Sequence, residues 1–328
     1  MLYLNSGYLN FDFILAQKQP FNFIVGGRGT GKTYGVLSKA AAGELGKIVY
    51  MRRTQAQADI ISKPDFSPFR SIDDGITVKP VTKYNAGIYK GESGEPLGYI
   101  VALSTISNLR GFDMSDVDTL IYDEFIAERH ERPIKQEGTA FLNCYETINR
   151  NRELQGRKPL TVICLANANN LSNPVFIELG LVSKAEKMER EKQEFSILPK
   201  RGIALFVLTE SPISQAKSET AIYKLTAGSE FYRMSIDNDF RLDREGCGAL
   251  PIKEFIPICT INNLTFYRHK SSALYYVADF KNGGCEMLSS SKQFLSRYPF
   301  IKELVLSANI RYQNYEVKET FLSMINVL

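Results

Sequence analysis

Short apolar runs recur along about the first two thirds of the chain, separated by mixed or polar stretches. Continuous apolar runs are typical of strands buried on both faces of a sheet. Between them lie segments rich in Ala, Leu and Lys, or with apolar residues at helical spacing, which predict helices. The expected strands are 21–25, 48–51, 99–103, 119–122, 161–165 and 203–208, and the expected helices are 32–42 and 141–154. This alternation predicts an α/β fold, with helices on both faces of a parallel sheet.

The pattern changes in the rest of the chain. Residues 62–98 are irregular and rich in Pro and Gly, and we expect a small hairpin there at the sheet edge. Beyond a polar stretch, Tyr and Phe become frequent and short strands dominate. We therefore expect a first domain at 1–208, a linker at 209–225 and a smaller α+β domain at 226–328.

Composition narrows the class of protein only slightly. Hydrophobic residues make up 44% and charged residues 23%, which is ordinary for a soluble globular protein. No apolar run is long enough to cross a membrane, and residues 1–10 lack the pattern of a secretory signal. Five scattered cysteines and two histidines predict reduced thiols and make a histidine-based metal site improbable. The net charge of +4 is too small to indicate nucleic-acid binding by itself.

The first expected strand and helix are joined by the complete phosphate-loop pattern G-x-x-x-x-G-K-[ST]. Its residues are Gly26, Gly27, Arg28, Gly29, Thr30, Gly31, Lys32 and Thr33. The glycines let backbone N–H groups curl around phosphate oxygens at the start of a helix. Lys32 would reach the β- and γ-phosphates, and the Thr33 hydroxyl would bind Mg²⁺. The alternative is a glycine-rich turn that binds nothing, which the flanking strand and helix disfavour.

An acidic pair follows another expected strand. Residues 119–122 are followed by Asp123 and Glu124, the Walker-B form of hydrolytic motors. Asp123 would contact Mg²⁺, and Glu124 would polarise the attacking water as a general base. The alternative is a carboxylate pair that caps the next helix. The pair favours ATP hydrolysis coupled to movement over a small-molecule kinase.

Two further sets of polar residues are candidates for the site. Asn167 and Asn169 follow the strand at 161–165, where Asn167 could bind the γ-phosphate or the water; an asparagine turn is the alternative. Arg150 and Arg152 follow the helix before that strand and are candidates for an arginine finger acting on a neighbouring subunit. Their alternative role is a basic helix C-terminus favoured by the helix dipole.

These residues together resemble the large terminase and DNA-packaging ATPase superfamily of tailed bacteriophages, most closely the packaging ATPases of phi-twenty-nine-like phages. The motifs cover about residues 20–175. The segments that carry the resemblance are Arg28, Leu109-Arg110-Gly111, Ile121-Tyr122-Asp123-Glu124, Leu165-Ala166-Asn167-Ala168-Asn169 and Ile48-Val49-Tyr50-Met51-Arg52-Arg53.

The resemblance implies a P-loop ATPase of the additional-strand, conserved-glutamate type. It would form a homopentameric ring that uses ATP and Mg²⁺ to drive double-stranded DNA through a portal into a preformed procapsid. A structural RNA on the portal would anchor the ATPase. Arg150 or Arg152 would be the finger in trans, and Arg53 would assist nucleotide exchange. Such a motor would act in the cytoplasm of the infected bacterial host, transiently at the portal vertex, and would be absent from the mature virion.

The resemblance also implies that the second domain is ribonuclease-H-like. Two-metal nucleases need clustered carboxylates. The candidate acids here, Asp237, Asp239 and Asp279, are scattered along the sequence. We therefore expect a nuclease-like domain without nuclease activity, which docks to nucleic acid, portal or procapsid.

Two other functions stay open on the sequence. A filamentous-phage assembly ATPase usually carries a membrane span, which this sequence lacks. A nucleotide-binding structural adaptor without translocation would not need Glu124.

Overall fold

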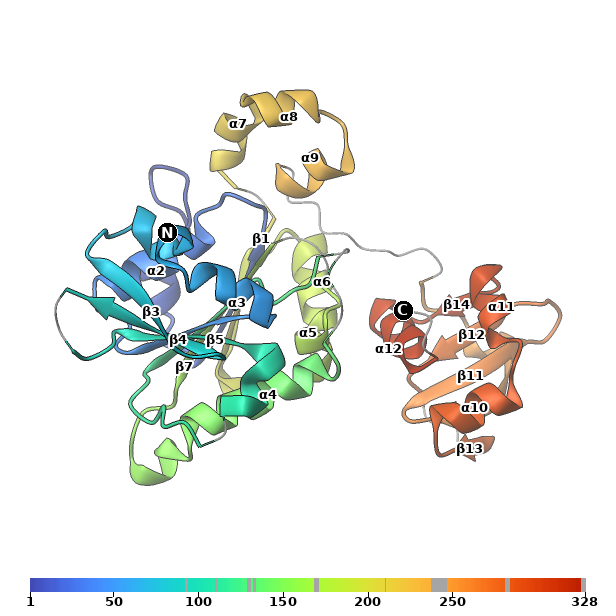
Figure 1. Ribbon diagram of the computed structural model, residues 1–328. Helices are drawn as coiled ribbons and strands as arrows, with labels where there is room; N and C mark the ends of the chain where they lie inside the picture. The colour runs from blue at the N-terminus through green and yellow to red at the C-terminus, as the bar shows by residue number, and fades with distance from the viewer. Residues whose placement is uncertain are drawn as a thin grey trace. The chain divides into compact units, whose positions relative to one another are not determined.

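The computed structural model describes residues 1–91, 94–109, 111–128, 131, 134–167, 171–209, 211–236, 247–280 and 284–325 (Figure 1). The chain divides into two compact units, Met1–Arg241 and Leu242–Leu328. Each unit has its own sheet and its own hydrophobic core.

The first unit is built on a nine-stranded sheet with the order β3-β4-β5-β2-β6-β7-β1-β9-β8. The six strands from β5 to β9 in this order pair in parallel. They are β5 (Gly98–Ala102), β2 (Ile48–Arg52), β6 (Thr119–Asp123), β7 (Thr161–Asn167), β1 (Phe21–Gly26) and β9 (Ile203–Leu208). These strands confirm the six apolar runs as the parallel core of an α/β fold.

Antiparallel strands complete both edges of this sheet. On one side, β3 (Ile76–Thr82) and β4 (Asn85–Lys90) form a hairpin that pairs with β5. This confirms the hairpin expected within 62–98. On the other side, β8 (Phe195–Leu198) pairs with β9.

Helices cover both faces of the sheet because side chains along each parallel strand point alternately to two cores. On β1, Phe23 and Val25 belong to one core and Ile24 to the other. The first core is closed by α4 (Glu137–Asn149), α5 (Pro174–Glu178) and α6 (Val182–Arg190), which Figure 1 shows together on one side. The second is closed by α1 (Phe11–Leu15), α2 (Lys32–Ala41) and α3 (Gln55–Ile61).

The helix expected at 141–154 lies in α4 but ends earlier. Arg150 and Asn151 have φ angles of +43° and +56°, in the left-handed region that terminates helices. A short 3₁₀ turn, Arg152–Gln155, follows. The Asn149 side chain accepts a hydrogen bond from the Leu160 backbone N–H at 3.0 Å, which ties the helix end to the chain that enters β7. The break sends Arg150 and Arg152 in different directions.

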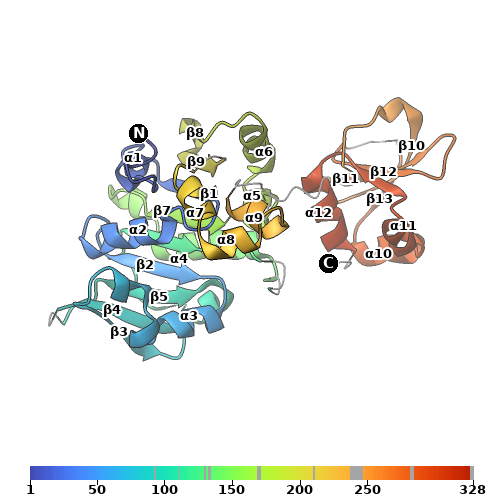
Figure 2. The same ribbon diagram turned by 90° about the horizontal axis from the view of Figure 1, so that it is seen from above.

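Three short helices follow β9, in residues expected as a linker and as the start of the second domain. They are α7 (Ile213–Ser218), α8 (Ala221–Leu225) and α9 (Glu230–Ser235). Both Figure 1 and Figure 2 place them at the end of the sheet where β1 ends. They belong to the first compact unit.

The second unit has a five-stranded sheet with the order β13-β10-β11-β12-β14. Its strands are β10 (Phe255–Ile261), β11 (Leu264–His269), β12 (Tyr275–Ala278), β13 (Glu286–Leu288) and β14 (Ile310–Tyr312). Aromatic and aliphatic side chains pack the sheet against α10 (Ser291–Arg297), α11 (Ile301–Leu306) and α12 (Tyr315–Met324). The α+β composition agrees with the expectation for this part of the chain, and the ribonuclease-H-like assignment stays a prediction. Within the described parts of the chain, no helix has both the length and the apolar character needed to span a bilayer.

Candidate nucleotide site

The phosphate loop joins β1 to α2, as the sequence predicts. Gly31 is the N-cap of α2 with a φ of +87°, and Gly29 has a φ of +71°. Both angles favour glycine, because a side chain is strained there. An added Cβ at Gly31 would also lie 3.1 Å from the Tyr8 ring. The loop therefore takes the turn that points helix N–H groups toward a bound anion.

Lys32 is folded back onto the loop that it serves. Its Nζ donates hydrogen bonds to the carbonyls of Gly26 at 3.0 Å and Gly27 at 2.7 Å. Burial lowers the pKa of Lys32 to about 7, with the nearby charges of Lys217 and Arg28 acting in the same direction. Asp123 and Glu124 oppose this shift, and phosphate oxygens would add negative charge beside the buried ammonium.

Thr33 and Asp123 face each other across the ends of α2 and β6. The Thr33 hydroxyl lies 3.1 and 3.2 Å from the two carboxylate oxygens of Asp123. The Tyr50 hydroxyl donates to Asp123 at 2.7 Å and fixes the carboxylate. A hydroxyl beside a carboxylate is the donor set of Mg²⁺ in P-loop ATPases, so these residues fit the expected metal.

Glu124 follows directly in a strained backbone conformation. Its φ is +55°, which is uncommon for a residue with a side chain and occurs often at functional sites. Its carboxylate forms an ion pair with Arg52 and is 44% exposed. Burial raises the pKa of Glu124, and Asp123 adds to this while Arg52 opposes it. The next described helix is α4, which starts at Glu137, so the geometry does not favour the helix-capping alternative.

Arg52 and Arg53 leave the end of β2 toward opposite faces of the sheet. Arg52 contacts Asp123 at 3.1 Å and also pairs with Glu124. Arg53 is fully buried on the other face, where Nε and Nη2 donate to both oxygens of Glu137 at 2.7 and 2.9 Å. Its Nη1 donates to Glu131 at 2.8 Å. Arg53 therefore holds the segment after β6, while Arg52 is the member of the pair beside the Walker-B carboxylates.

The two finger candidates differ sharply in exposure. Arg152 is 3% exposed, and its Nη2 donates to the carbonyl of Val117 at 2.8 Å. Val117 precedes β6, so this contact is at the opposite end of the strand from Asp123. Arg150 is 41% exposed and pairs with Asp113 at 3.1 Å. Arg150 is thus the one of the two that can reach a neighbour without leaving a buried position.

Asn167 is the last residue of β7, which lies between β1 and β6 in the sheet. It pairs in register with Gly26, at the start of the phosphate loop. The backbone therefore brings Asn167 to the same carboxyl end of the parallel strands as Lys32 and Asp123. Asn169 and Arg110 lie outside the described residues.

Sequence reasoning overlooked two residues in contact with the phosphate loop. One is Tyr8, whose ring lies beside Gly31. The other is Lys217 of α7, whose Nζ donates to the backbone carbonyl of Arg28. Arg28 itself forms an ion pair with Glu128. No local pattern marks Tyr8 or Lys217, because only the fold brings them to the loop.

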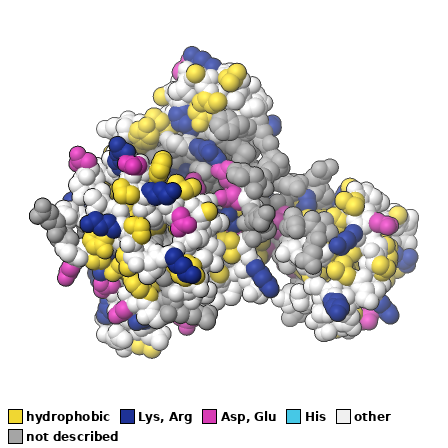
Figure 3. Space-filling model, in the orientation of Figure 1, with side chains coloured by type: hydrophobic (Ala, Val, Ile, Leu, Met, Phe, Trp, Pro, Cys, Tyr) yellow, Lys and Arg dark blue, Asp and Glu magenta, His cyan; other side chains and the backbone are white. Residues whose placement is uncertain are grey.

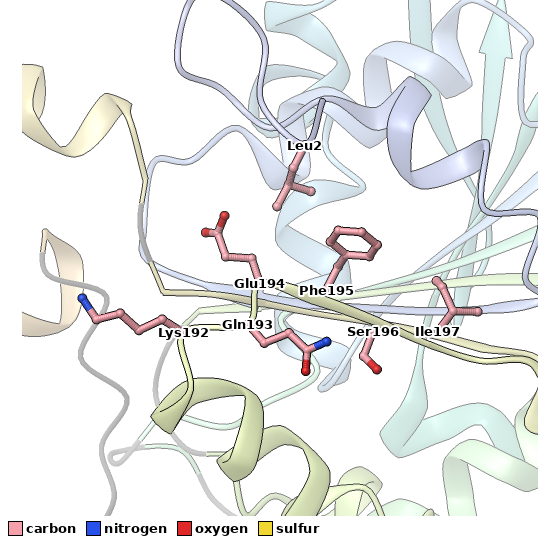
Figure 4. Close-up of a pocket in the computed structure, with 7 residues that line it drawn as sticks. All are labelled: Leu2, Lys192, Gln193, Glu194, Phe195, Ser196 and Ile197. Carbon is pink, nitrogen blue, oxygen red and sulfur yellow. The ribbon is translucent and has the colours of Figure 1, made fainter.

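A surface hollow lies beside the edge strand β8 (Figure 4). Leu2 and residues 192–197 line it, and none of them is a predicted site residue.

On the face of the first unit that Figure 3 shows, Lys and Arg side chains of the described residues are interspersed with Asp and Glu.

The acids of the second unit do not form a described metal site. Within the ranges that the structure describes, no three His, Cys, Asp or Glu side chains are grouped to hold an ion. Asp279 is exposed, and its backbone N–H donates to the Gln313 side chain at 2.9 Å. Asp237 and Asp239 precede the second unit in the sequence and lie outside the described residues.

Comparison with solved structures shows that the fold is shared along nearly the whole chain. A chain of "The Phi-28 gp11 DNA packaging Motor" matches with a TM-score of 0.67 and 18% identity, covering 98% of both chains. A chain of "The bacteriophage Phi-29 viral genome packaging motor assembly" matches with a TM-score of 0.64 and 19% identity, covering 97% of this chain and 98% of that one.

Comparison of sequences identifies relatives and a family. The "DNA packaging protein" of Bacillus phage phi29 is 27% identical over 242 residues, which cover 72% of this chain and 66% of that protein. The protein of the same description from Bacillus phage B103 is 28% identical over 241 residues, covering 71% and 68%. The match thus spans slightly less than two thirds of the phi29 relative. The model of the family described as "Podovirus DNA encapsidation protein (Gp16)" matches residues 4–247. Because this match covers most of its length, the chain belongs to the Podovirus Gp16 DNA-encapsidation family.

Proposed function

We propose that this protein is an ATPase that drives double-stranded viral DNA into a preformed procapsid. The observation that carries the proposal is the arrangement of Lys32, Thr33, Asp123 and Glu124 at the carboxyl ends of the parallel strands. These residues combine phosphate binding, a metal-binding pair and a general base. Membership of the Gp16 family supports DNA packaging as the work that hydrolysis drives.

The contacts in the site suggest how each residue acts. Lys32 exchanges its carbonyl partners for the β- and γ-phosphates, while Thr33 and Asp123 hold Mg²⁺. The metal, when bound, neutralises charge that develops on the phosphates. Glu124 must release Arg52 before its carboxylate can accept a proton from water, so the ion pair restrains the base in the arrangement described above.

The proposal includes assembly into a ring, expected to be a pentamer, in which Arg150 completes the site of a neighbouring subunit. The solved motors that share this fold support a multi-subunit assembly. The portal, the procapsid and a structural packaging RNA are the proposed partners. The second unit would dock to nucleic acid, portal or procapsid without cutting DNA, and Asn167 would contact the γ-phosphate or the water.

The direct test is ATP hydrolysis by the purified protein, measured with and without double-stranded DNA. We expect Mg²⁺-dependent release of phosphate that increases when DNA is present. A protein that binds ATP but never turns it over would instead be the nucleotide-binding adaptor. If DNA does not change the rate of ATP hydrolysis and no DNA is packaged into purified procapsids, the translocation step of the proposal is wrong.

The trans role of Arg150 makes a separate prediction. Arg150→Ala is expected to lower the rate of ATP hydrolysis about ten- to a hundredfold. This is less than the roughly thousandfold effect of an arginine finger that already points into its site. The effect is smaller because Arg150 must first break its ion pair with Asp113. Mixing Arg150→Ala subunits with Lys32→Ala subunits should restore part of the activity, since each supplies what its neighbour lacks. The measurement is hydrolysis as a function of mixing ratio.

The matched control for that experiment is Arg157→Ala, an exposed arginine near Arg150. It should hydrolyse ATP normally and should rescue the Lys32→Ala protein no better than the wild type does. Absence of rescue by Arg150→Ala at every ratio would show that this arginine does not act between subunits.

A further inference from the structure

Lys217 reaches the outer side of the phosphate loop from helix α7. Its Nζ donates to the backbone carbonyl of Arg28 and, at 2.9 Å, to the carbonyl of Ser235 at the end of α9. An added Cβ at Gly29 would lie 3.2 Å from Lys217 Cε, so the lysine stem lies directly against the loop. One ammonium thus joins the phosphate loop to the end of the three-helix segment α7–α9.

Packing at the start of α7 helps to hold this lysine in place. An added Cβ at Gly7 would lie only 3.0 Å from the Ile213 backbone nitrogen, so α7 is seated on the N-terminal loop. That loop is in turn bonded to the phosphate loop, since the Leu9 N–H donates to the Thr30 carbonyl at 3.0 Å. The Lys217 ammonium also lies 5.2 Å from the centre of the Tyr223 ring, a cation–π contact within α7–α9.

Three basic side chains lie at the phosphate loop, with the carboxylates of Asp123, Glu124 and Glu128 nearby. The basic side chains are Lys32, Arg28 and Lys217, and of these Arg28 has a carboxylate partner in Glu128. Among the described residues, the Lys217 ammonium contacts two backbone carbonyls and an aromatic ring. Burial lowers the pKa of Lys217. A triphosphate would relieve the repulsion between these cations.

We propose that Lys217 binds the phosphates of the nucleotide in the same subunit and thereby couples nucleotide binding to α7–α9. This inference rests on the proposed function, because it takes a nucleoside triphosphate as the ligand. When phosphate charge draws the ammonium inward, the carbonyl of Ser235 must follow it or lose its bond. Ser235 ends α9, after which the chain continues toward the second unit. Lys217 therefore transmits the nucleotide state to the segment that leads out of the ATPase unit.

The test compares Lys217→Met and Lys217→Arg with the control Lys224→Met. Lys224 lies on α8 in the same segment, but it is exposed and pairs with Glu219 at 3.0 Å. Affinities for fluorescent ATP and ADP analogues are measured with Mg²⁺, together with hydrogen exchange of α7–α9 amides with and without a non-hydrolysable ATP analogue. Exchange separates coupling from mere support, because a structural role would alter it equally in both states.

We expect Lys217→Met to bind the ATP analogue about five- to tenfold more weakly, with a smaller loss for ADP, which carries less charge. Nucleotide-dependent protection of α7–α9 should disappear in this variant. Lys217→Arg should retain most of both effects, and Lys224→Met should behave as wild type. Wild-type affinity and wild-type protection in Lys217→Met would overturn the inference while leaving the proposed function intact. A wild-type protein that binds no triphosphate would instead overturn the proposed function and the inference with it.

Discussion

Replacing Glu124 with Gln is expected to lower the rate of ATP hydrolysis about a thousandfold while ATP binding stays within about twofold of wild type. The amide keeps the size of the side chain and its φ of +55° but cannot accept the proton of the attacking water. Binding should be retained because the proposed contacts of Lys32 with the phosphates and of Thr33 with the metal do not involve this carboxylate. Single-turnover phosphate release and equilibrium binding of an ATP analogue measure the two effects separately.

Two companion substitutions sharpen this result. Asp123→Asn should weaken Mg²⁺-dependent binding as well as hydrolysis, because Asp123 faces the Thr33 hydroxyl in the proposed metal-binding pair. Glu44→Gln removes a carboxylate from a surface ion pair with Lys39 and should change neither. Hydrolysis by Glu124→Gln at a rate close to wild type would contradict the general-base role and leave the catalytic step unassigned.

Replacing Arg53 with Met is expected to destabilise the first unit by about 3–5 kcal/mol, because it leaves buried carboxylates without a counter-charge. Glu137 is 3% exposed and accepts two hydrogen bonds from Arg53. It also accepts one from the Tyr122 hydroxyl at 3.1 Å, which carries no charge. Glu131 loses one charged donor and keeps Gln57. Chemical denaturation of the full chain, followed by far-UV circular dichroism, measures the change in the free energy of unfolding.

Neutralising the partners should recover much of that loss. In Arg53→Met combined with Glu131→Gln and Glu137→Met, no unpaired charge stays buried, so we expect more than half of the stability to return. Arg70→Met removes an exposed arginine 3.7 Å from Asp65 and should cost less than about 0.5 kcal/mol. The role in nucleotide exchange implied by family resemblance predicts a different result: normal stability with altered release of ADP. That outcome would show that holding the buried carboxylates is not the main role of Arg53.

Local patterns explain why much of the fold could be predicted. The strands β1, β2, β5, β6, β7 and β9 are continuous apolar runs, and such runs suit only a sheet covered on both faces. The phosphate loop is equally local, since its glycine angles and its helix are set by adjacent residues. The end of α4 was less predictable, because apolar spacing continued to Leu154 while Arg150 and Asn151 adopted left-handed conformations. Leu154 is consequently exposed.

Pairs of like residues were separated only by the fold. Arg52 and Arg53 have the same side chain and adjacent positions, so composition cannot say which one enters the nucleotide site. The alternation of β2 sends Arg52 to the face of Asp123 and Arg53 to the face of α4. In the same way, the left-handed turn after α4 exposes Arg150 and buries Arg152 against the carbonyl of Val117.

By itself, the sequence determined the parallel α/β core, the phosphate loop and the acidic pair at the end of a strand, because each depends on residues close together in the chain. The tertiary structure alone decided which charges meet. It paired Arg52 with Glu124, enclosed Arg53 between two carboxylates and brought Lys217 to the phosphate loop. The physical reason is that a charge interacts with whatever lies within a few ångströms, and distances between remote segments exist only once the sheet and its connections have formed.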